Sequence, residues 1–431
     1  MRRFLLVLLA VVIVFSFTIS LSAADKVTLR LGWWGNPTRD ARTIKVVEMY
    51  EALNPNVNIE TETVGWAGYW DKLNTQGAAG NLPDIIQMDY AYITTWVKND
   101  QLLDLGPYVK SKKLDLTGVP ETFISGGRVK NKLYGVSLGT NAVCMIYDPA
   151  ILQKAGVAAP TPDWTWADLE KMALEIYNKT GVQVPPLGGA TDPRVVFDNM
   201  IRQTKKAFFN PKDGASLGFT DTKLLIEWFE TNLRLLKAGA MVRPDIAFGG
   251  AVTPQESGLA KGTEWLGPAF WSNQVVMMQT AMNRPIGIIT MPKIAKSKQP
   301  GTYLKPSMFF SVTKKSLHKD EAVKFVNYFI NDIEANKVLM GERGIPIVPK
   351  VRDTLKALVD PVNKQIFDYI DLAGNNASPI DPPDPPGAGE VLKAFLTINQ
   401  EVLYQTISPK EAAAKFMKQA NEILAKNKAA N

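Results

Sequence analysis

The sequence predicts an α/β protein built on parallel strands, and three consecutive stretches near its N-terminal end support this class. Residues 27–31 alternate between apolar and polar side chains, as a half-buried strand does. Residues 40–53 carry apolar side chains at helical spacing and end before a proline. Residues 57–61 alternate again. Such a β-α-β unit places its two strands parallel, with a right-handed crossover.

The same alternation of elements continues along the first third of the chain. We expect a short helix at 71–76, a buried strand at 84–88 and another helix at 91–98. Open parallel sheets bind ligands beyond the carboxyl ends of their strands. The segments to inspect for a site are therefore those that follow each strand, at 32–36, 64–69 and 89–92.

A second block begins near Val143. Thr165 and Asp168 have the spacing of a capping box, which predicts the start of a helix that runs to about residue 177. Proline-rich residues 378–387 can be neither helix nor central strand, so we expect a rigid loop there. Apolar periodicity predicts further helices at 221–238, 319–331 and 409–425.

The first 24 residues have the composition of a cleavable signal peptide. Arg2 and Arg3 precede an uncharged apolar run at 4–17, and small residues follow at 22–24. That run is shorter than the roughly 20 residues that span a bilayer. We expect cleavage near Ala23 or Ala24 and export to the periplasm.

Cys144 is the only cysteine of the chain, and it lies in an apolar run far from the expected cleavage point. A lipid anchor would need a cysteine at that point, so we expect a protein free in the periplasm and not a lipoprotein. In its apolar surroundings Cys144 is expected to be a small buried hydrophobe rather than a nucleophile.

Charge and composition exclude several functions. The formal net charge of +7 includes two arginines of the expected signal peptide, and the remaining basic residues form no block. A nucleic-acid binder would cluster them on one face. Metal-ligand spacing and phosphate-binding glycine loops are both missing from the sequence, so no cofactor is expected. We also expect the protein to be a monomer.

Several motifs in order resemble the extracellular solute-binding proteins of sugar ABC importers, the group that includes maltose-binding protein. Residues 80–86 are similar to the Gly-x-x-Pro-Asp-Ile turn of that family, and residues 162–169 to its Pro-x-Thr-Trp-x-Glu-Leu segment. Residues 321–329 are close to its Glu-Ala-x-x-Phe helix. Further similar segments lie at 49–59, 132–136, 146–148 and 341–346.

The resemblance implies a two-lobed periplasmic-binding-protein fold. Each lobe would be a mostly parallel sheet flanked by helices, and hinge crossings would join the lobes near 139–141, 303–308 and 344–348. Lobe closure around a carbohydrate would then allow delivery to the importer's permease subunits. The expected bounds are 1–24 for the signal peptide, 25–140 and 306–344 for the N-lobe, and 141–305 and 345–431 for the C-lobe.

Aromatic and polar residues after the strands are the candidate ligand contacts, because sugars offer C–H faces to stack on and hydroxyls to bond. Alternation sends one of Trp33 and Trp34 to the core, and we favour Trp34 for the site. Two glycines around Trp66 are expected to let the aromatic side chains project. The candidates of the N-lobe and its first crossing are Trp34, Asn36, Trp66, Tyr69, Asp89, Tyr90 and Asn141.

The opposing wall would come from the second lobe, where Trp265 and Trp271 are the candidates. Asn283 stands where the family often has a stacking tryptophan, so the stacking on that side is expected to differ. Arg343, on the turn near the last crossing, could donate hydrogen bonds to two hydroxyls of the ligand or stabilise the hinge. We expect Trp164, Trp166 and Trp228 to be structural, whereas Trp96 could be either.

Two other functions stay open. The same fold could bind a glycerol phosphodiester or a polyol. A periplasmic glycoside hydrolase would need two facing carboxylates, and Asp381 and Asp384 lie close in sequence without any mark of a catalytic pair. His318 is the only histidine, and its surroundings suggest a solvated helix start, so we expect no enzyme.

Overall fold

The computed structural model describes residues 26–189, 192–249 and 253–429. The expected signal peptide, residues 1–24, lies outside this part of the chain. Within the described residues, no helix combines the length and the apolar character that crossing a membrane requires.

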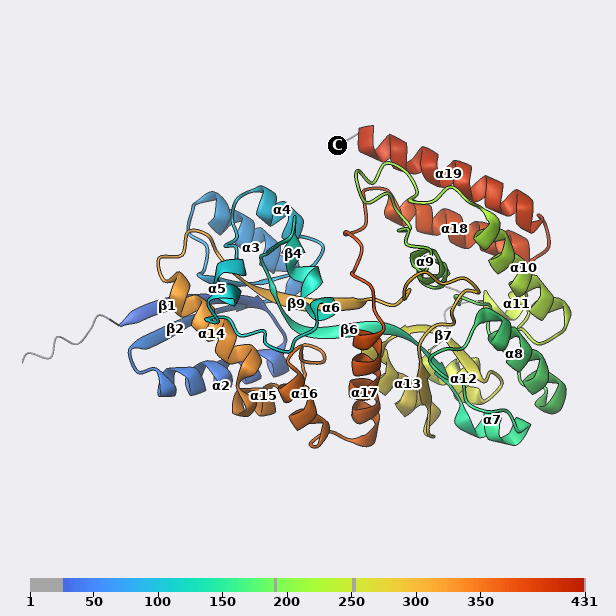
Figure 1. Ribbon diagram of the computed structural model, residues 1–431, viewed down its shortest axis with the longest axis horizontal. Coiled ribbons are helices and arrows are strands. Elements are labelled where there is room, and N and C mark those ends of the chain that lie inside the picture. The colour runs from blue at the N-terminus through green and yellow to red at the C-terminus, as the bar shows by residue number, and fades with distance from the viewer. Residues whose placement is uncertain (1–25, 190–191, 250–252, 430–431) are drawn as a thin grey trace, which may run out of the picture.

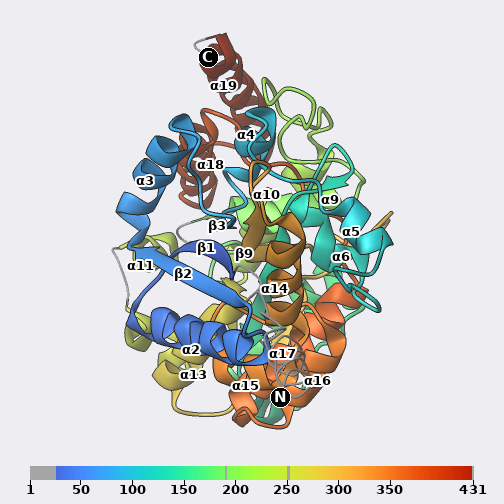
Figure 2. The same ribbon diagram turned by 90° about the vertical axis from the view of Figure 1, so that its left-hand side faces the viewer.

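The N-terminal β-α-β unit is confirmed. β1 (Val27–Trp34) and β2 (Val57–Val64) pair in parallel, and α2 (Pro37–Leu53) connects them. β3 (Ile85–Met88) pairs in parallel with the other side of β1. Figure 2 shows α2 on one face of these strands and α3 (Trp66–Ala78) on the other. The carboxyl ends of three parallel strands therefore lie at one edge of the sheet.

Two of these helices begin earlier than predicted. The Asn36 side chain accepts a hydrogen bond of 3.0 Å from the Arg39 amide and caps α2, which has Pro37 in its first turn. α3 begins at Trp66 instead of residue 71. Its N-cap, Gly65, offers no side-chain hydrogen bond, so the sequence carries no start signal there.

The rest of the sheet is antiparallel. Four further strands complete it: β6 (Val136–Tyr147), β7 (Leu266–Trp271), β8 (Gly287–Ile289) and β9 (Leu304–Val312). The strands follow the order β2-β1-β3-β9-β6-β7, with β8 also paired to β6. The pairs β3–β9, β6–β9, β6–β7 and β6–β8 are all antiparallel, so the expected mostly parallel sheet is found only around β1.

β6 connects two groups of elements. Its first residues pair with β9, whereas its last residues pair with β7 and β8. Figure 1 shows helices gathered at both ends of β6 and β9. The buried apolar side chains of the described residues form two clusters, which we call the first core and the second core. Cys144 is fully buried in the first core, as predicted.

The first core is continuous across both expected lobes, since it also includes C-lobe side chains such as Leu259, Val275 and Met282. α16 (Pro349–Lys356) and α17 (Pro361–Asn375) bury Leu355, Ile366 and Tyr369 against it. Only from α18 (Ala388–Leu403) onward does the C-terminal part pack in the second core. The loop 378–387, which has no helix or strand, joins these two parts of the chain.

The helices with the clearest periodicity are confirmed. α8 (Trp166–Thr180) begins at the predicted capping box, in which the Thr165 amide donates to Asp168 at 2.8 Å. Trp164, Trp166, Trp228 and Trp96 are all buried. The other confirmed helices are α4 (Ile93–Lys98), α10 (Lys223–Lys237), α14 (Lys319–Asn331) and α19 (Pro409–Ala429).

Short elements complete the described chain. The helices are α5 (Gly106–Lys110), α6 (Glu121–Ile124), α7 (Pro149–Ala155), α9 (Arg194–Arg202), α11 (Pro244–Ala247), α12 (Gly258–Lys261), α13 (Val275–Met282) and α15 (Ile333–Leu339). The 3₁₀ turns are Ser125–Gly127, Pro254–Glu256 and Ser272–Gln274. The strands β4 (Arg128–Val129) and β5 (Lys132–Leu133) form a separate antiparallel pair.

Candidate ligand-binding site

An aromatic cluster lies at the carboxyl ends of β1, β2 and β3, and its members are Trp34, Trp66, Tyr69, Trp70 and Tyr92. The rings of Trp34 and Trp66 meet edge to face, with centroids 5.0 Å apart. The rings of Trp70 and Tyr92 lie 4.2 Å apart and are tilted by 37°. Trp66 is 46% exposed and Tyr92 is 39% exposed. The cluster therefore offers two ring surfaces to solvent at the edge where an α/β sheet binds ligands.

The early start of α3 explains why these rings gather. Trp66 is the first residue of the helix, and Tyr69 and Trp70 follow one turn later, on the same face. A Cβ atom added to Gly65 or Gly68 would meet nothing within 4 Å. The glycines are therefore not what makes room for the rings, and the helix geometry itself directs them.

Tyr69 is a support of the cluster and not a surface for a ligand. Its side chain is buried, and its hydroxyl donates to the carbonyls of Gln87 at 2.7 Å and Gly32 at 3.2 Å. Burial raises the pKa of this hydroxyl far above its ordinary value. Trp34 is also nearly buried, and its ring packs edge to face against the ring of Trp66.

Asp89 and Tyr90 lie where predicted, directly after β3. One carboxylate oxygen of Asp89 accepts from the Ala91 amide at 2.8 Å, and the residue is partly buried. The Tyr90 hydroxyl donates to the backbone carbonyl of Asp381, in the loop 378–387. Tyr90 thus connects the strand ends to a loop almost 300 positions later in the chain.

A group of charged residues extends from this loop to α9, and we call it the arginine network. Arg202 is buried, forms an ion pair with Asp381 and donates to Ser378 Oγ at 2.7 Å. Arg194 donates to both oxygens of Asp384, at 3.0 and 2.9 Å. Sequence reasoning noted the two aspartates but missed both arginines, because nothing local marks pairs so far apart.

Trp271 and Asn141 lie beside the arginine network. The Arg202 guanidinium is 4.7 Å from the centroid of the Tyr303 ring, and this ring lies 6.2 Å from that of Trp271. The Ser272 hydroxyl donates to Asn141 Oδ1 at 3.4 Å. A connected path of contacts therefore runs from Tyr90, through the arginine network, to Trp271.

Two predicted contacts, Trp265 and Asn283, lie elsewhere, and a third, Asn36, is engaged in capping a helix. Trp265 is 0% exposed and packs in the second core, so it has no surface for a ligand. Asn36 is occupied as the cap of α2. Asn283 ends α13 in a left-handed conformation and lines a shallow pocket with Pro361 of α17. In Figure 1, α13 and α17 lie along the lower edge, away from α3 and α4 at the upper edge.

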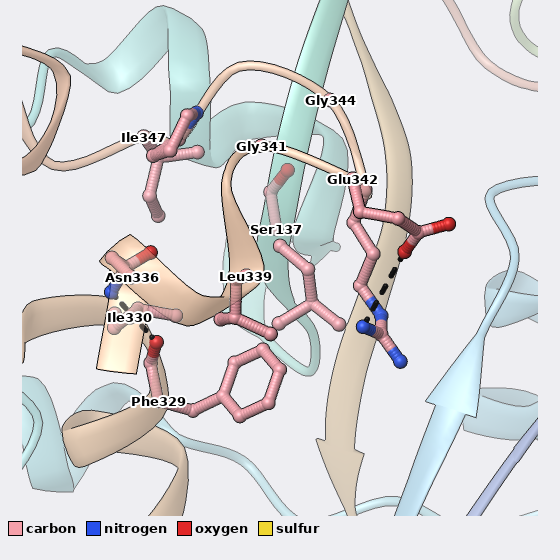
Figure 3. A pocket seen from close by; sticks show the side chains of 12 residues that line it. Ser137, Phe329, Ile330, Asn336, Leu339, Gly341, Glu342, Gly344 and Ile347 are labelled. Carbon is pink, nitrogen blue, oxygen red and sulfur yellow. Dashed lines mark hydrogen bonds and ion pairs between the residues drawn. The ribbon is translucent and has the colours of Figure 1, made fainter. Parts of the chain in front are cut away.

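Arg343 is a buried brace. Its guanidinium donates to Gln87 Oε1 at 3.0 Å and to Thr43 Oγ1 at 2.9 Å, and burial lowers its pKa. The adjacent cavity has a volume of about 20 Å³, enough for roughly one water molecule and too small for a sugar. Figure 3 shows Phe329, Leu339 and Glu342 around it.

Comparison with known proteins of similar sequence or fold shows which family this chain resembles. The sequence profile of the bacterial extracellular solute-binding proteins matches residues 45–364. An extracellular solute-binding protein of Alicyclobacillus acidocaldarius is 30% identical, with a TM-score of 0.85 over 93% of this chain and 98% of its own. A periplasmic oligogalacturonide-binding protein of Yersinia enterocolitica shares the fold at 22% identity, with a TM-score of 0.76 over 93% and 100%.

Curated relatives match over shorter stretches. An arabinooligosaccharide-binding protein of Bacillus subtilis is 25% identical over 52% of this chain and 53% of its own. A putative binding protein of Brucella abortus is 27% identical over 28% of this chain and 29% of its own. The profile match covers most of the chain, and the fold agrees with it. The chain therefore belongs to the bacterial extracellular solute-binding proteins.

Proposed function

We propose that this protein captures a carbohydrate, in the form of an oligosaccharide, outside the inner membrane and delivers it to the permease subunits of an ABC importer. The observation that carries the proposal is the pair of exposed rings, Trp66 and Tyr92, at the carboxyl ends of the parallel strands. The names of the Bacillus and Yersinia relatives, which bind oligosaccharides, support the same class of ligand.

Capture would use both ends of β6. A sugar ring would stack on Trp66 or Tyr92, while Asp89 accepts a hydroxyl hydrogen bond. Trp271 and Asn141 would approach from the other side as the two lobes rotate toward each other about β6, β9 and the loop 378–387. We assign the lobes as predicted, because α17 packs against α13, β8 and the 3₁₀ turn Ser272–Gln274, which all belong to the C-lobe.

A phosphodiester ligand and a catalytic role both find little support among the described residues. A phosphate would be held best by several cations, whereas Arg194 and Arg202 are each paired with a carboxylate and the cation beside Trp271 is the single ammonium of Lys305. The same pairing occupies Asp384 and Asp381, so these two carboxylates do not face one scissile bond. His318 is exposed ahead of α14. We therefore propose a binding protein without catalytic activity.

Export by a cleaved signal peptide would leave the protein in the periplasm as a free monomer. The extracellular character of the family supports the location. An uncharacterised lipoprotein of Streptomyces antibioticus is 27% identical over 36% of this chain, so tethering occurs among similar proteins. The position of Cys144, buried in the first core, supports an untethered form here.

Thermal unfolding of the purified protein with a carbohydrate panel tests the proposed ligand class. A sugar present at one hundred times its Kd should raise the free energy of unfolding by about 2.7 kcal/mol, because it binds only the native state. Glycerol phosphodiesters and polyols serve as the comparison ligands. Stabilisation by a phosphodiester, with none by any sugar, would contradict the carbohydrate assignment, and turnover of a glycoside would contradict the binding role.

A further inference from the structure

Asp198, on α9, is a partly buried carboxylate that the arginine network leaves without a partner. Arg194 is taken by Asp384 and Arg202 by Asp381. Among the described residues, Asp198 makes no hydrogen bond or ion pair, and its Oδ1 atom is buried. Burial raises the pKa of this carboxyl to about 7, even though both arginines oppose the change.

A second carboxylate is partly in the same condition. Asp192, just before α9, accepts hydrogen bonds from the backbone amides of Arg194 and Val195, but its buried Oδ1 atom has no partner and burial raises its pKa. Charge from Asp384 acts on both Asp192 and Asp198 and makes their ionisation harder. An unpaired buried carboxylate is unfavourable unless something supplies the missing charge.

The charges around Asp198 do not balance. Four carboxyl groups, of Asp192, Asp198, Asp381 and Asp384, act on one another beside only two guanidiniums, those of Arg194 and Arg202. Lys305 lies farther along the path of contacts, with its ammonium 5.2 Å from the centroid of the Trp271 ring. Tyr303 brings an aromatic ring against the same network, and such rings favour cations.

We propose that Asp198, with Asp192, forms a subsite for a protonated amine on the ligand, so that the protein selects an amino sugar over neutral and acidic sugars. This inference rests on the proposed carbohydrate capture. An ammonium group brings three donors and one positive charge, which a hydroxyl cannot do. A uronic acid would meet the surplus negative charge and be repelled.

The matched ligands are a glucosamine trisaccharide and its fully N-acetylated form, which share one backbone and differ in charge. Calorimetric titration at pH 7 should give at least about tenfold tighter binding of the amine form, as expected for a charge-assisted hydrogen bond. Asp198→Asn should reduce this preference to about twofold or less and leave the affinity for the neutral form unchanged. Asp353→Asn, at an exposed carboxylate of α16, should change neither affinity.

The pH dependence of the unmodified protein gives a second readout that needs no variant. Binding requires the ionised carboxylate and the protonated amine, so affinity for the amine form should pass through a maximum near neutral pH. On the acid side it should fall by about tenfold between pH 7.5 and pH 5.5, because Asp198 takes up a proton. The N-acetylated form should lack the alkaline decline.

The outcomes separate this inference from the proposed function. Equal affinity for both trisaccharides, or tighter binding of a galacturonate oligomer, overturns the amine subsite and leaves carbohydrate capture standing. Failure of every sugar to bind, whatever its charge, overturns both. If Asp198→Asn does not fold, the pH profile of the unmodified protein still decides, and a flat acid side contradicts the role of Asp198.

Discussion

Trp66→Ala should weaken binding of the captured carbohydrate by about 2 kcal/mol, roughly 30-fold in Kd, the loss typical of a central aromatic contact. The ring is half-exposed, and the side chains that hold it, Trp34 and Trp70, remain in place after truncation. The free energy of unfolding should therefore fall by no more than about 1 kcal/mol. Calorimetric titration and urea unfolding measure the two effects separately.

Tyr404→Ala is the matched control, because this ring is also half-exposed but lies at the end of α18, far along the chain from the aromatic cluster. It should leave carbohydrate affinity unchanged. A loss of several kcal/mol of stability in Trp66→Ala, with unchanged affinity, would show that the ring belongs to the core. The site would then have to lie elsewhere.

Arg343→Ala should produce the largest loss of stability, about 3–5 kcal/mol, because it removes one member of a buried hydrogen-bonded group. Gln87 and Thr43 each lose a donor, and the rings of Phe329 and Phe310 lose the cation 5.5 and 6.0 Å away. Urea unfolding measures this loss. Carbohydrate affinity of the folded protein should fall much less than in Trp66→Ala, because Arg343 reaches the buried members Trp34 and Tyr69 only through Gln87.

Arg243→Ala provides the comparison, because its ion pair with Asp245 is exposed and such pairs contribute little. Its unfolding free energy should change by less than about 0.5 kcal/mol. If Arg343→Ala instead left stability intact and abolished sugar binding, Arg343 would be a ligand contact and the buried brace would be the wrong description.

Local patterns carried enough information for the β-α-β start and for α8, α10 and α14. In each case apolar periodicity and a boundary residue lie within a few positions, as in the Thr165 capping box. The start of α3 could not be read in this way, because Gly65 caps it without a side chain. Trp66 and Tyr69 were both predicted to contact the ligand. Both lie on this helix, but Trp66 is exposed whereas Tyr69 is buried.

The candidate site was harder to predict wherever it depends on distant pairs. The Arg194–Asp384 pair joins positions 190 apart, and the Tyr90–Asp381 contact joins positions 291 apart. Neither has a signature in local composition. Trp265 and Trp271 looked equivalent in the sequence, yet only the fold shows that one lies in the second core and the other beside Tyr303.

A crystal structure of the protein with the tightest-binding sugar from the panel tests the proposed location of the binding site most directly. We expect a sugar ring stacked on Trp66 or Tyr92, with further contacts to Asp89 and to Trp271. Binding at a position that touches none of these four side chains would contradict this expectation, even if the affinity were high.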